Sequence, residues 1–254
     1  MRIARTIGDV RAALAGASDV GLVPTMGFFH EGHLSLVRAA RGESEVVVVS
    51  LFVNPAQFGD AADLAAYPRD GARDAAVAEE AGVDLLFAPP VEELYPPGFQ
   101  TWVDVEEVSR ELEGEFRPGH FRGVATICLK LFNIVRPNRA YFGQKDAQQV
   151  EVLRRMIADL DLELELRVLP TVRDDDGLAL SSRNAHLSPQ ERQAALALPR
   201  ALATRDPDAA RRMLNGLVVD YLEIADFDPP VLAGAVRVGS TRLIDNVPLE
   251  GEST

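Results

Sequence analysis

Residues 20–33 read VGLVPTMGFFHEGH, and their pattern indicates the fold class of the chain. The apolar residues 20–23 predict a buried strand that ends at Pro24. A loop containing Gly27 follows, and a helix is predicted to begin near Glu31. A strand that runs through a short loop into a helix is the building unit of α/β proteins with a parallel sheet.

The same alternation continues on both sides of this unit through the first two-thirds of the chain. Residues 46–53 are apolar at almost every position, as expected of a strand that is covered on both faces. Thr6 and Asp9 predict the capped start of a helix that ends before Gly16. Further strands are expected at 83–87, 140–142 and 164–169, and further helices at 70–81, 121–135 and 145–160. This order predicts right-handed crossovers and a doubly wound parallel sheet, which is an α/β fold.

The composition of the chain changes after residues 183 and 184. Residues 188–191, SPQE, predict the capped start of an alanine-rich helix, and the rest is typical of a small α+β unit. Just before the change, apolar residues flank Asp176-Gly177, a pair that predicts a hairpin turn. We therefore predict two domains, residues 1–183 with the parallel sheet and residues 184–254 as a small C-terminal domain.

Composition and charge exclude several classes of protein. The 254 residues include 26 Lys and Arg against 39 Asp and Glu, a net charge of −13 that disfavours binding to a nucleic-acid backbone. The single cysteine, Cys128, excludes a disulfide framework and a zinc site built on cysteines. The most apolar run, residues 46–53, is far shorter than the roughly 20 residues of a membrane helix. The N-terminus lacks an apolar secretory segment, so we expect a cytoplasmic protein without nucleic-acid or membrane partners.

Two histidines follow the strand predicted at residues 20–23. His30 and His33 are three residues apart, so on a helical turn both side chains project from the same side. The N-terminus of a helix attracts anions, and Gly32 lets a ligand approach the backbone closely. These features predict a phosphate site at the carboxyl end of the strand. Two alternatives stay open on the residues alone: a pair of surface histidines in a turn, or a zinc pair whose third ligand is not evident.

Two further segments that can bind phosphate also follow predicted strands or turns. Residues 143–146, GQKD, combine a lysine with an aspartate that suits a helix N-cap. Residues 180–184, LSSRN, supply two hydroxyl groups and a guanidinium group. Taken alone, each segment is also compatible with an ordinary surface turn. Because a parallel fold can bring strand ends together, we expect the three segments to converge on one polyphosphate.

Residues 23–37 resemble the His-x-Gly-His signature of the nucleotidylyltransferase superfamily, and the resemblance extends over nearly the whole chain. An ordered series of further blocks is similar to the pantoate–β-alanine ligase family in sequence and spacing. These blocks are residues 50–58, 67–69, 117–121, 130–135, 143–149, 170–173, 176–184 and 242–246. The resemblance implies a Rossmann-like nucleotidylyltransferase fold with a C-terminal lid, and a homodimeric, ATP-binding ligase of pantothenate biosynthesis.

The reaction that the resemblance implies has two steps. Pantoate attacks ATP to give pantoyl adenylate and pyrophosphate, and β-alanine then attacks the adenylate to give pantothenate and AMP. ATP implies Mg²⁺, and the phosphates can supply most of its ligands; Asp74 is a candidate helper, but we assign it no role as a ligand. Two alternatives stay open: another His-x-Gly-His adenylyltransferase, and a nucleotide-binding module without catalytic activity.

The resemblance also assigns roles to individual residues. The catalytic residues are expected to be His30, His33, Lys145 and Arg183, with His33 as the proton donor. ATP is expected to contact Met26, Gly27, His30, Gly32, His33, Gly143, Gln144, Lys145, Asp146, Val172, Leu180, Ser181, Ser182 and Arg183. Asn54, Gln57 and Gln149 are expected to bind pantoate, and Gln57 also β-alanine.

Three features fall outside these assignments. Cys128 lies on the apolar stripe of the helix predicted at 121–135, so we expect an inert thiol in the core or a pocket wall. Phe28 and Phe29 stand where the family more often has a small or polar residue and a leucine. The segment from 194 to 220 is shorter than in typical members, which implies a trimmed lid.

Overall fold

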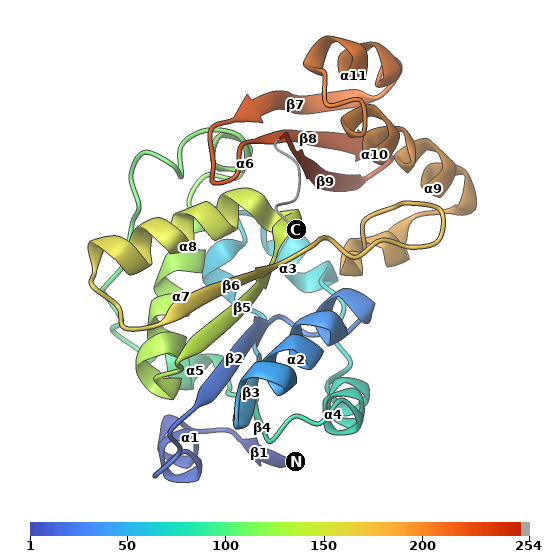
Figure 1. The fold of residues 1–254 in the computed structure, drawn as a ribbon. Coiled ribbons are helices and arrows are strands. Elements are labelled where there is room, and N and C mark those ends of the chain that lie inside the picture. Colours follow the sequence, from blue (N-terminus) through green and yellow to red (C-terminus); the bar gives the residue numbers. More distant parts are fainter. Residues whose placement is uncertain (250–254) are drawn as a thin grey trace. The chain divides into compact units, whose positions relative to one another are not determined.

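The computed structural model describes residues 1–249, which form two compact units. The first unit comprises Met1–Phe142 and Val152–Leu169, and the second comprises Gly143–Glu151 and the residues from Pro170 onward. Figure 1 shows the order of their helices and strands along the chain. Each unit contains its own sheet and its own buried core.

The first unit is built on a six-stranded sheet with the strand order β1-β4-β3-β2-β5-β6 (Figure 1). The strands are β1 (Arg2–Ala4), β2 (Val20–Thr25), β3 (Val46–Leu51), β4 (Leu85–Phe87), β5 (Arg139–Gly143) and β6 (Glu165–Leu169). Neighbouring strands from β1 through β5 pair in parallel. The chain moves outward from β2 through β3 to β4 and then adds β5 on the other side of β2, as in a doubly wound sheet. The predicted α/β class is confirmed.

Helices cover this sheet on both faces. On one face, α2 (Glu31–Glu43) packs on β2 and β3, and α4 (Gly71–Glu80) adds Ala78 to the same core. On the other, α7 (His120–Val135) packs on β2 and on α1 (Ile7–Ala13). The remaining elements of this unit are α3 (Ala61–Ala66), α5 (Val91–Leu94), α6 (Glu113–Phe116) and the 3-10 turn η1 (Pro55–Gln57). No helix among the described residues is long and apolar enough to cross a bilayer.

β3 shows why an uninterrupted apolar run folds as a strand here. Val47 and Val49 join the core that α2 covers, whereas Val48 points to the opposite face of the sheet. All three side chains are fully buried, because helices lie on both faces. The strand ends at Leu51, two residues before the predicted end.

Several element boundaries differ from the predictions for local reasons. β2 continues through Pro24, which is tolerated because at that position β2 pairs only with β3 and needs no second ladder hydrogen bond. The helix predicted at 145–160 starts with a 3-10 turn, η2 (Gln144–Asp146), before α8 (Ala147–Asp159). The predicted hairpin around Asp176-Gly177 is reduced to a single bridge between Arg173 and Ala179.

The second unit is a small α+β unit, as predicted. Its antiparallel sheet has the order β7-β8-β9, formed by β7 (Val218–Ala225), β8 (Val231–Val238) and β9 (Thr241–Pro248). Its helices are α9 (Pro189–Ala195), α10 (Ala197–Leu202) and α11 (Pro207–Met213), with the 3-10 turn η3 (Ser182–His186). The predicted capping box is present at the start of α9, where the Ser188 side chain accepts from the Glu191 N–H.

Contacts extend the second unit beyond the boundary predicted near residue 184. Asn246 of β9 donates from Nδ2 to the carbonyl oxygens of Gln144 and Lys145, both at 2.9 Å. The neighbouring Asp245 accepts two hydrogen bonds from the Arg173 guanidinium, at 2.6 and 3.0 Å. These bonds attach residues 143–151 and 170–183 to the C-terminal sheet. In the sequence, however, the two segments directly continue from β5 and β6 of the parallel sheet.

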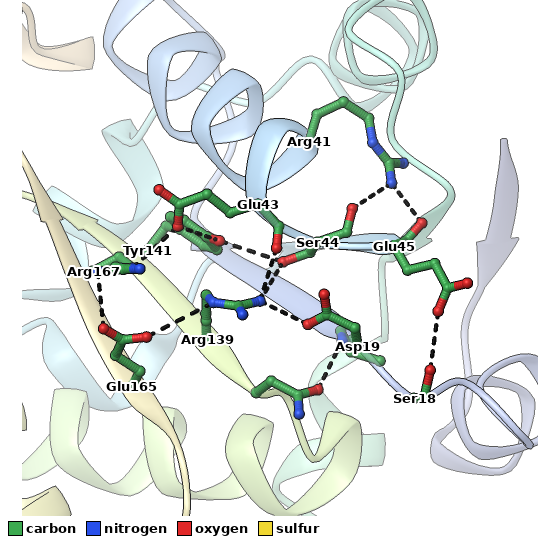
Figure 2. A network of polar contacts seen from close by, with 12 residues as sticks. Ser18, Asp19, Arg41, Glu43, Ser44, Glu45, Arg139, Tyr141, Glu165 and Arg167 are labelled. Atoms are coloured by element: carbon green, nitrogen blue, oxygen red, sulfur yellow. Dashed lines mark hydrogen bonds and ion pairs between the residues drawn. The ribbon is translucent and has the colours of Figure 1, made fainter.

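The amino-terminal edge of the parallel sheet carries a network of ion pairs and hydrogen bonds (Figure 2). Arg139, at the start of β5, donates to Asp19 at 2.7 Å and to the Glu43 carbonyl at 2.8 Å. The Glu43 carboxylate in turn accepts from Tyr141 and Arg167, both at 3.1 Å. Because these charges pair with one another at the edge opposite the strand carboxyl ends, we interpret this network as support for the sheet.

Candidate active site

The loop between β2 and α2 begins with a compact turn at the carboxyl end of β2. Thr25 donates from its hydroxyl to the Ser50 carbonyl of β3 at 2.6 Å and accepts from the Gly27 N–H at 3.3 Å. Gly27 and Phe28 both have positive φ angles, 86° and 54°. A Cβ atom on Gly27 would lie 2.5 Å from Leu51 and 2.8 Å from Asp74, so only glycine fits.

His30 and His33 are brought together at the first turn of α2, as predicted. His30 is the N-cap, and its Nδ1 accepts from the Gly32 N–H at 3.2 Å. The His33 Nδ1 accepts from the His30 N–H at 3.3 Å, and the two ring centroids are 4.1 Å apart. Because each Nδ1 acts as an acceptor, each neutral ring carries its proton on Nε2. With both Nδ1 atoms bound to the backbone, the Nε2 atoms are the groups with which the pair can donate to an anion at this helix N-terminus.

Asn54 and Gln57 form a buried pair of amides around η1. Asn54 donates from Nδ2 to the Gln57 Oε1 at 3.0 Å and to the Gly123 carbonyl at 3.1 Å, while its Oδ1 accepts from the Ala56 N–H at 3.3 Å. Asn54 thus uses its own donors within the protein, and its geometry suits positioning Gln57 better than contacting a ligand. Asn54 uses one lone pair of the Gln57 Oε1, and the Nε2 amide group of Gln57 is the donor it can offer to a substrate.

Gly123 of α7 allows η1 to approach this closely. A Cβ atom at this position would lie 2.4 Å from the Ala56 carbonyl oxygen, which real structures do not show. Nearby, the Tyr95 hydroxyl is buried and lacks a hydrogen-bond partner among the described residues. Burial raises the pKa of Tyr95, so the phenol stays neutral. Nothing in the sequence singles out Tyr95, because a tyrosine in an irregular loop carries no periodic signal.

Cys128 is buried in α7, as predicted, and burial raises the pKa of its thiol to about 12. The nucleophilic form of cysteine is the thiolate, which this environment disfavours. The prediction of an inert thiol in the apolar face of this helix agrees with the structure.

In the second unit, the turn that carries Lys145 is held from the last strand. The Lys145 Nζ lies 3.6 Å from the Asp146 carboxylate. Asn246 donates to the carbonyls of Gln144 and Lys145 and accepts from the Gln144 side chain at 3.3 Å. Asn246 is buried, and the only sequence signal for it was its place in the matching block at 242–246. Gln149 follows on α8 and is partly buried.

The other predicted ATP-binding residues of the second unit form two adjacent segments. The Leu180 N–H donates to the Val172 carbonyl at 3.0 Å, which places these two predicted contacts side by side. Ser181 is the N-cap of η3, and its hydroxyl accepts from the Arg183 N–H at 3.3 Å. Ser182 and Arg183 then occupy the first turn of η3. The hydroxyls and the guanidinium of this motif thus lie on one short turn.

The described residues contain no group of three or more His, Cys, Asp or Glu side chains that could hold a metal ion. Asp74 lies beside the loop after β2, but both of its carboxylate oxygens accept backbone N–H groups, from Phe28 at 2.7 Å and from Phe29 at 2.8 Å. The described residues therefore do not fit a protein-built Mg²⁺ site, and the zinc alternative for His30 and His33 gains no third ligand among them.

Comparisons with known proteins agree with the resemblance in the sequence. The family model described as pantoate-beta-alanine ligase matches residues 2–248. The pantothenate synthetase of Roseiflexus castenholzii is 52% identical, over 98% of this chain and 100% of that protein. The pantothenate synthetase of Moorella thermoacetica is 50% identical, over 98% and 99%.

Two crystal structures of such enzymes are similar over the whole chain. Pantothenate synthetase from Thermus thermophilus has a TM-score of 0.95 at 46% identity, covering 99% of this chain and 100% of that one. Pantoate-beta-alanine ligase from Francisella tularensis, complexed with beta-gamma ATP and beta-alanine, has a TM-score of 0.88 at 33% identity and covers 100% of both chains. The chain therefore belongs to the pantoate–β-alanine ligase family.

Proposed function

We propose that the chain condenses pantoate with β-alanine in an ATP-dependent reaction that passes through pantoyl adenylate. The single observation that carries this proposal is the arrangement of His30 and His33 at the start of α2, where the Nδ1 atoms of both rings accept backbone N–H groups. Membership of the family and the ligands named for the Francisella tularensis enzyme support the substrates. Another His-x-Gly-His adenylyltransferase is not favoured by any feature of the site.

In the first step, a carboxylate oxygen of pantoate attacks the α-phosphorus of ATP, and the bond to pyrophosphate breaks. Negative charge builds on the phosphate oxygens, so donors that are already in place stabilise the transition state. His30 and His33 suit this task because the backbone fixes their tautomers before ATP arrives. His33 is proposed to donate from Nε2 to the transferring phosphate.

The second group of phosphate ligands lies in the second unit, and its assignment to ATP rests on the resemblance. Lys145 and Arg183 would neutralise the triphosphate, with hydroxyl groups from Ser181 and Ser182. Their local support is consistent with this role, because Lys145 and Arg183 each lie in a 3-10 turn that buried or capping hydrogen bonds hold. The remaining expected ATP contacts, from Met26 to Leu180, are part of the same proposal.

In the second step, the amine of β-alanine attacks the acyl carbon of the adenylate, an amide forms, and AMP leaves with the acyl oxygen–carbon bond broken. The attacking amine is neutral, and the proton that it loses on forming the amide passes to solvent. Gln57 is proposed to bind the acid substrates by donating from its Nε2 amide group, while its Oε1 accepts from Asn54. Gln149 is proposed to contact pantoate on the resemblance alone.

Three further predictions stay proposals: a homodimer, a cytoplasmic location, and Mg²⁺ as an ion that arrives with ATP. When bound, Mg²⁺ would shield the charge of the phosphates. Sedimentation at several protein concentrations tests the dimer.

Isotope exchange between pyrophosphate and ATP tests the proposed reaction. The first step alone predicts exchange that requires pantoate and proceeds without β-alanine. Exchange that does not respond to pantoate, or that requires another acceptor, would contradict the adenylate route. A chain that binds ATP but exchanges nothing with any acid would instead support a nucleotide-binding module.

A further inference from the structure

The loop that leads to His30 is held by a carboxylate from a different helix. Asp74, in the first turn of α4, is almost fully buried, with 2% of its side chain exposed. Its Oδ2 accepts from the Phe28 N–H at 2.7 Å and its Oδ1 from the Phe29 N–H at 2.8 Å. Each oxygen therefore satisfies one of two consecutive backbone donors directly before the histidine.

The conformation that Asp74 holds is one that the loop does not adopt readily by itself. Phe28 has φ 54°, in the left-handed region that residues with a Cβ disfavour. A buried, charged acceptor makes stronger hydrogen bonds than a neutral one, so the carboxylate offsets the strain. The preceding Gly27 is also left-handed and leaves room for the carboxylate, since a Cβ there would lie 2.8 Å from Oδ2.

Arg73, the residue before Asp74, also contacts this loop. Its Nη2 donates to the Phe29 carbonyl at 3.0 Å, and its guanidinium lies 5.5 Å from the centroid of the Phe28 ring. Its Nη1 also lies 3.6 Å from the Asp74 carboxylate, which reduces the cost of burying that charge. The adjacent residues Arg73 and Asp74 thus bind the carbonyl and the N–H of Phe29, respectively.

The support itself is rigid. Asp70 caps α4 by accepting the Arg73 N–H at 3.0 Å, and the Asp74 N–H donates to the Asp70 carbonyl at 2.9 Å. One turn further along, Ala78 is buried in the core that α2 and the sheet share. Asp74 therefore lies on a helix that is anchored to the sheet independently of the loop.

We propose that Asp74 is a positioning residue for ATP, which fixes the backbone of Phe28 and Phe29 and thereby the N-cap and ring of His30. This inference rests on the proposed ATP site at His30 and His33, and Asp74 acts through His30 without touching the nucleotide. Asp74 bonds to the backbone of the loop before His30, so its effect falls on nucleotide affinity and leaves the pantoate KM unchanged.

The Asp74→Asn variant tests this role. The side chain keeps its size, but one oxygen becomes an NH₂ group that cannot accept a hydrogen bond, so one loop N–H loses its partner. We expect the KM for ATP and the Kd of a non-hydrolysable ATP analogue to rise about tenfold, with the pantoate KM within about twofold. Hydrogen–deuterium exchange should accelerate at residues 27–30 and stay slow in α4.

Asp220→Asn is the matched control. Asp220 is a carboxylate of similar burial, with 5% of its side chain exposed, and it pairs with Arg237 at 2.9 Å and Arg242 at 2.6 Å in the second unit. Its replacement should lower the Tm without changing the Kd of the analogue. An equal loss of nucleotide affinity in both variants would overturn the positioning role, as would an analogue Kd in Asp74→Asn within about twofold of the unchanged chain.

Two arrangements keep the test decisive. If Asp74→Asn does not fold, Arg73→Met removes the hydrogen bond to Phe29 and keeps an apolar stem, and it should weaken analogue binding by a smaller factor. An unchanged Kd in Arg73→Met then overturns the proposal. An unchanged chain that binds the analogue but shows no pantoate-dependent exchange contradicts the proposed function, while the comparison of Kd values still decides the role of Asp74.

Discussion

Replacing His33 with alanine removes two separate interactions. The first is the hydrogen bond that its Nδ1 accepts from the His30 N–H at 3.3 Å, part of the cap of α2. Loss of a cap of this kind costs about 1 kcal/mol of unfolding free energy, which lowers the Tm by about 2–4 °C. The second is the proposed Nε2–H donor to the transferring phosphate, whose loss slows the reaction by about 10²–10³-fold.

The variant His33→Gln separates these two effects. Glutamine at the third helical position reaches back to the N-cap N–H, as in a capping box, so the Tm should recover. The donor at Nε2 is not replaced in the same place, so pantoate-dependent pyrophosphate exchange should stay as low as in His33→Ala. The measurements are exchange at saturating ATP and pantoate, and thermal unfolding of the same preparations.

Two results would refute this reasoning. Exchange in His33→Ala within about threefold of the unchanged chain would mean that His33 does not serve the phosphate. Recovery of both exchange and Tm in His33→Gln would mean that His33 acts only through the helix cap.

Four other substitutions, at three positions, test the site and its support. Gln57→Ala should weaken the pantoate response by about 1–3 kcal/mol, because a bound oxygen loses its donor, while titration with an ATP analogue stays nearly unchanged; a large loss of nucleotide affinity would place Gln57 in the other site. Asn246→Asp removes the donor to the carbonyls of Gln144 and Lys145, so chemical denaturation should show that the free energy of unfolding falls by about 1–3 kcal/mol. An unchanged free energy of unfolding would contradict a stabilising role for these two hydrogen bonds. Cys128→Val should keep exchange activity and Cys128→Ser should lower the Tm, because only serine buries a hydroxyl in the apolar face of α7; an inactive but folded valine variant would count against the core assignment.

The parallel sheet could be predicted because its signals are local. Residues 46–53 are apolar in succession, and the two faces of β3 are both buried. The spacing of His30 and His33 likewise placed both rings on the first turn of α2. Three-residue β1 gave no such signal, because it is too short to show a period.

The supporting residues could not be predicted, because they act over long stretches of sequence. Asp74 binds the Phe28 N–H across 46 positions, and a single aspartate near a helix start is usually only a cap. Asn54 stays a predicted pantoate contact from the resemblance, but the sequence does not show that its amide also bonds to Gln57, Ala56 and Gly123. The boundary near residue 184 missed the same kind of contact, between Arg173 and Asp245.

Asn246 leaves the ribosome 102 residues after Gln144, whose carbonyl it binds. Protein synthesis adds about 5–20 residues per second, so roughly 5–20 s pass between synthesis of the turn that carries Lys145 and synthesis of Asn246, which binds its carbonyl groups. The turn that carries Lys145 is therefore completed only after β9 has been synthesised, when the strands of the parallel sheet already lie outside the ribosome. A chain that stops before β9 would contain Lys145 but would lack the hydrogen bonds from Asn246 to its turn. We expect such a chain to lose activity while it still forms the parallel sheet.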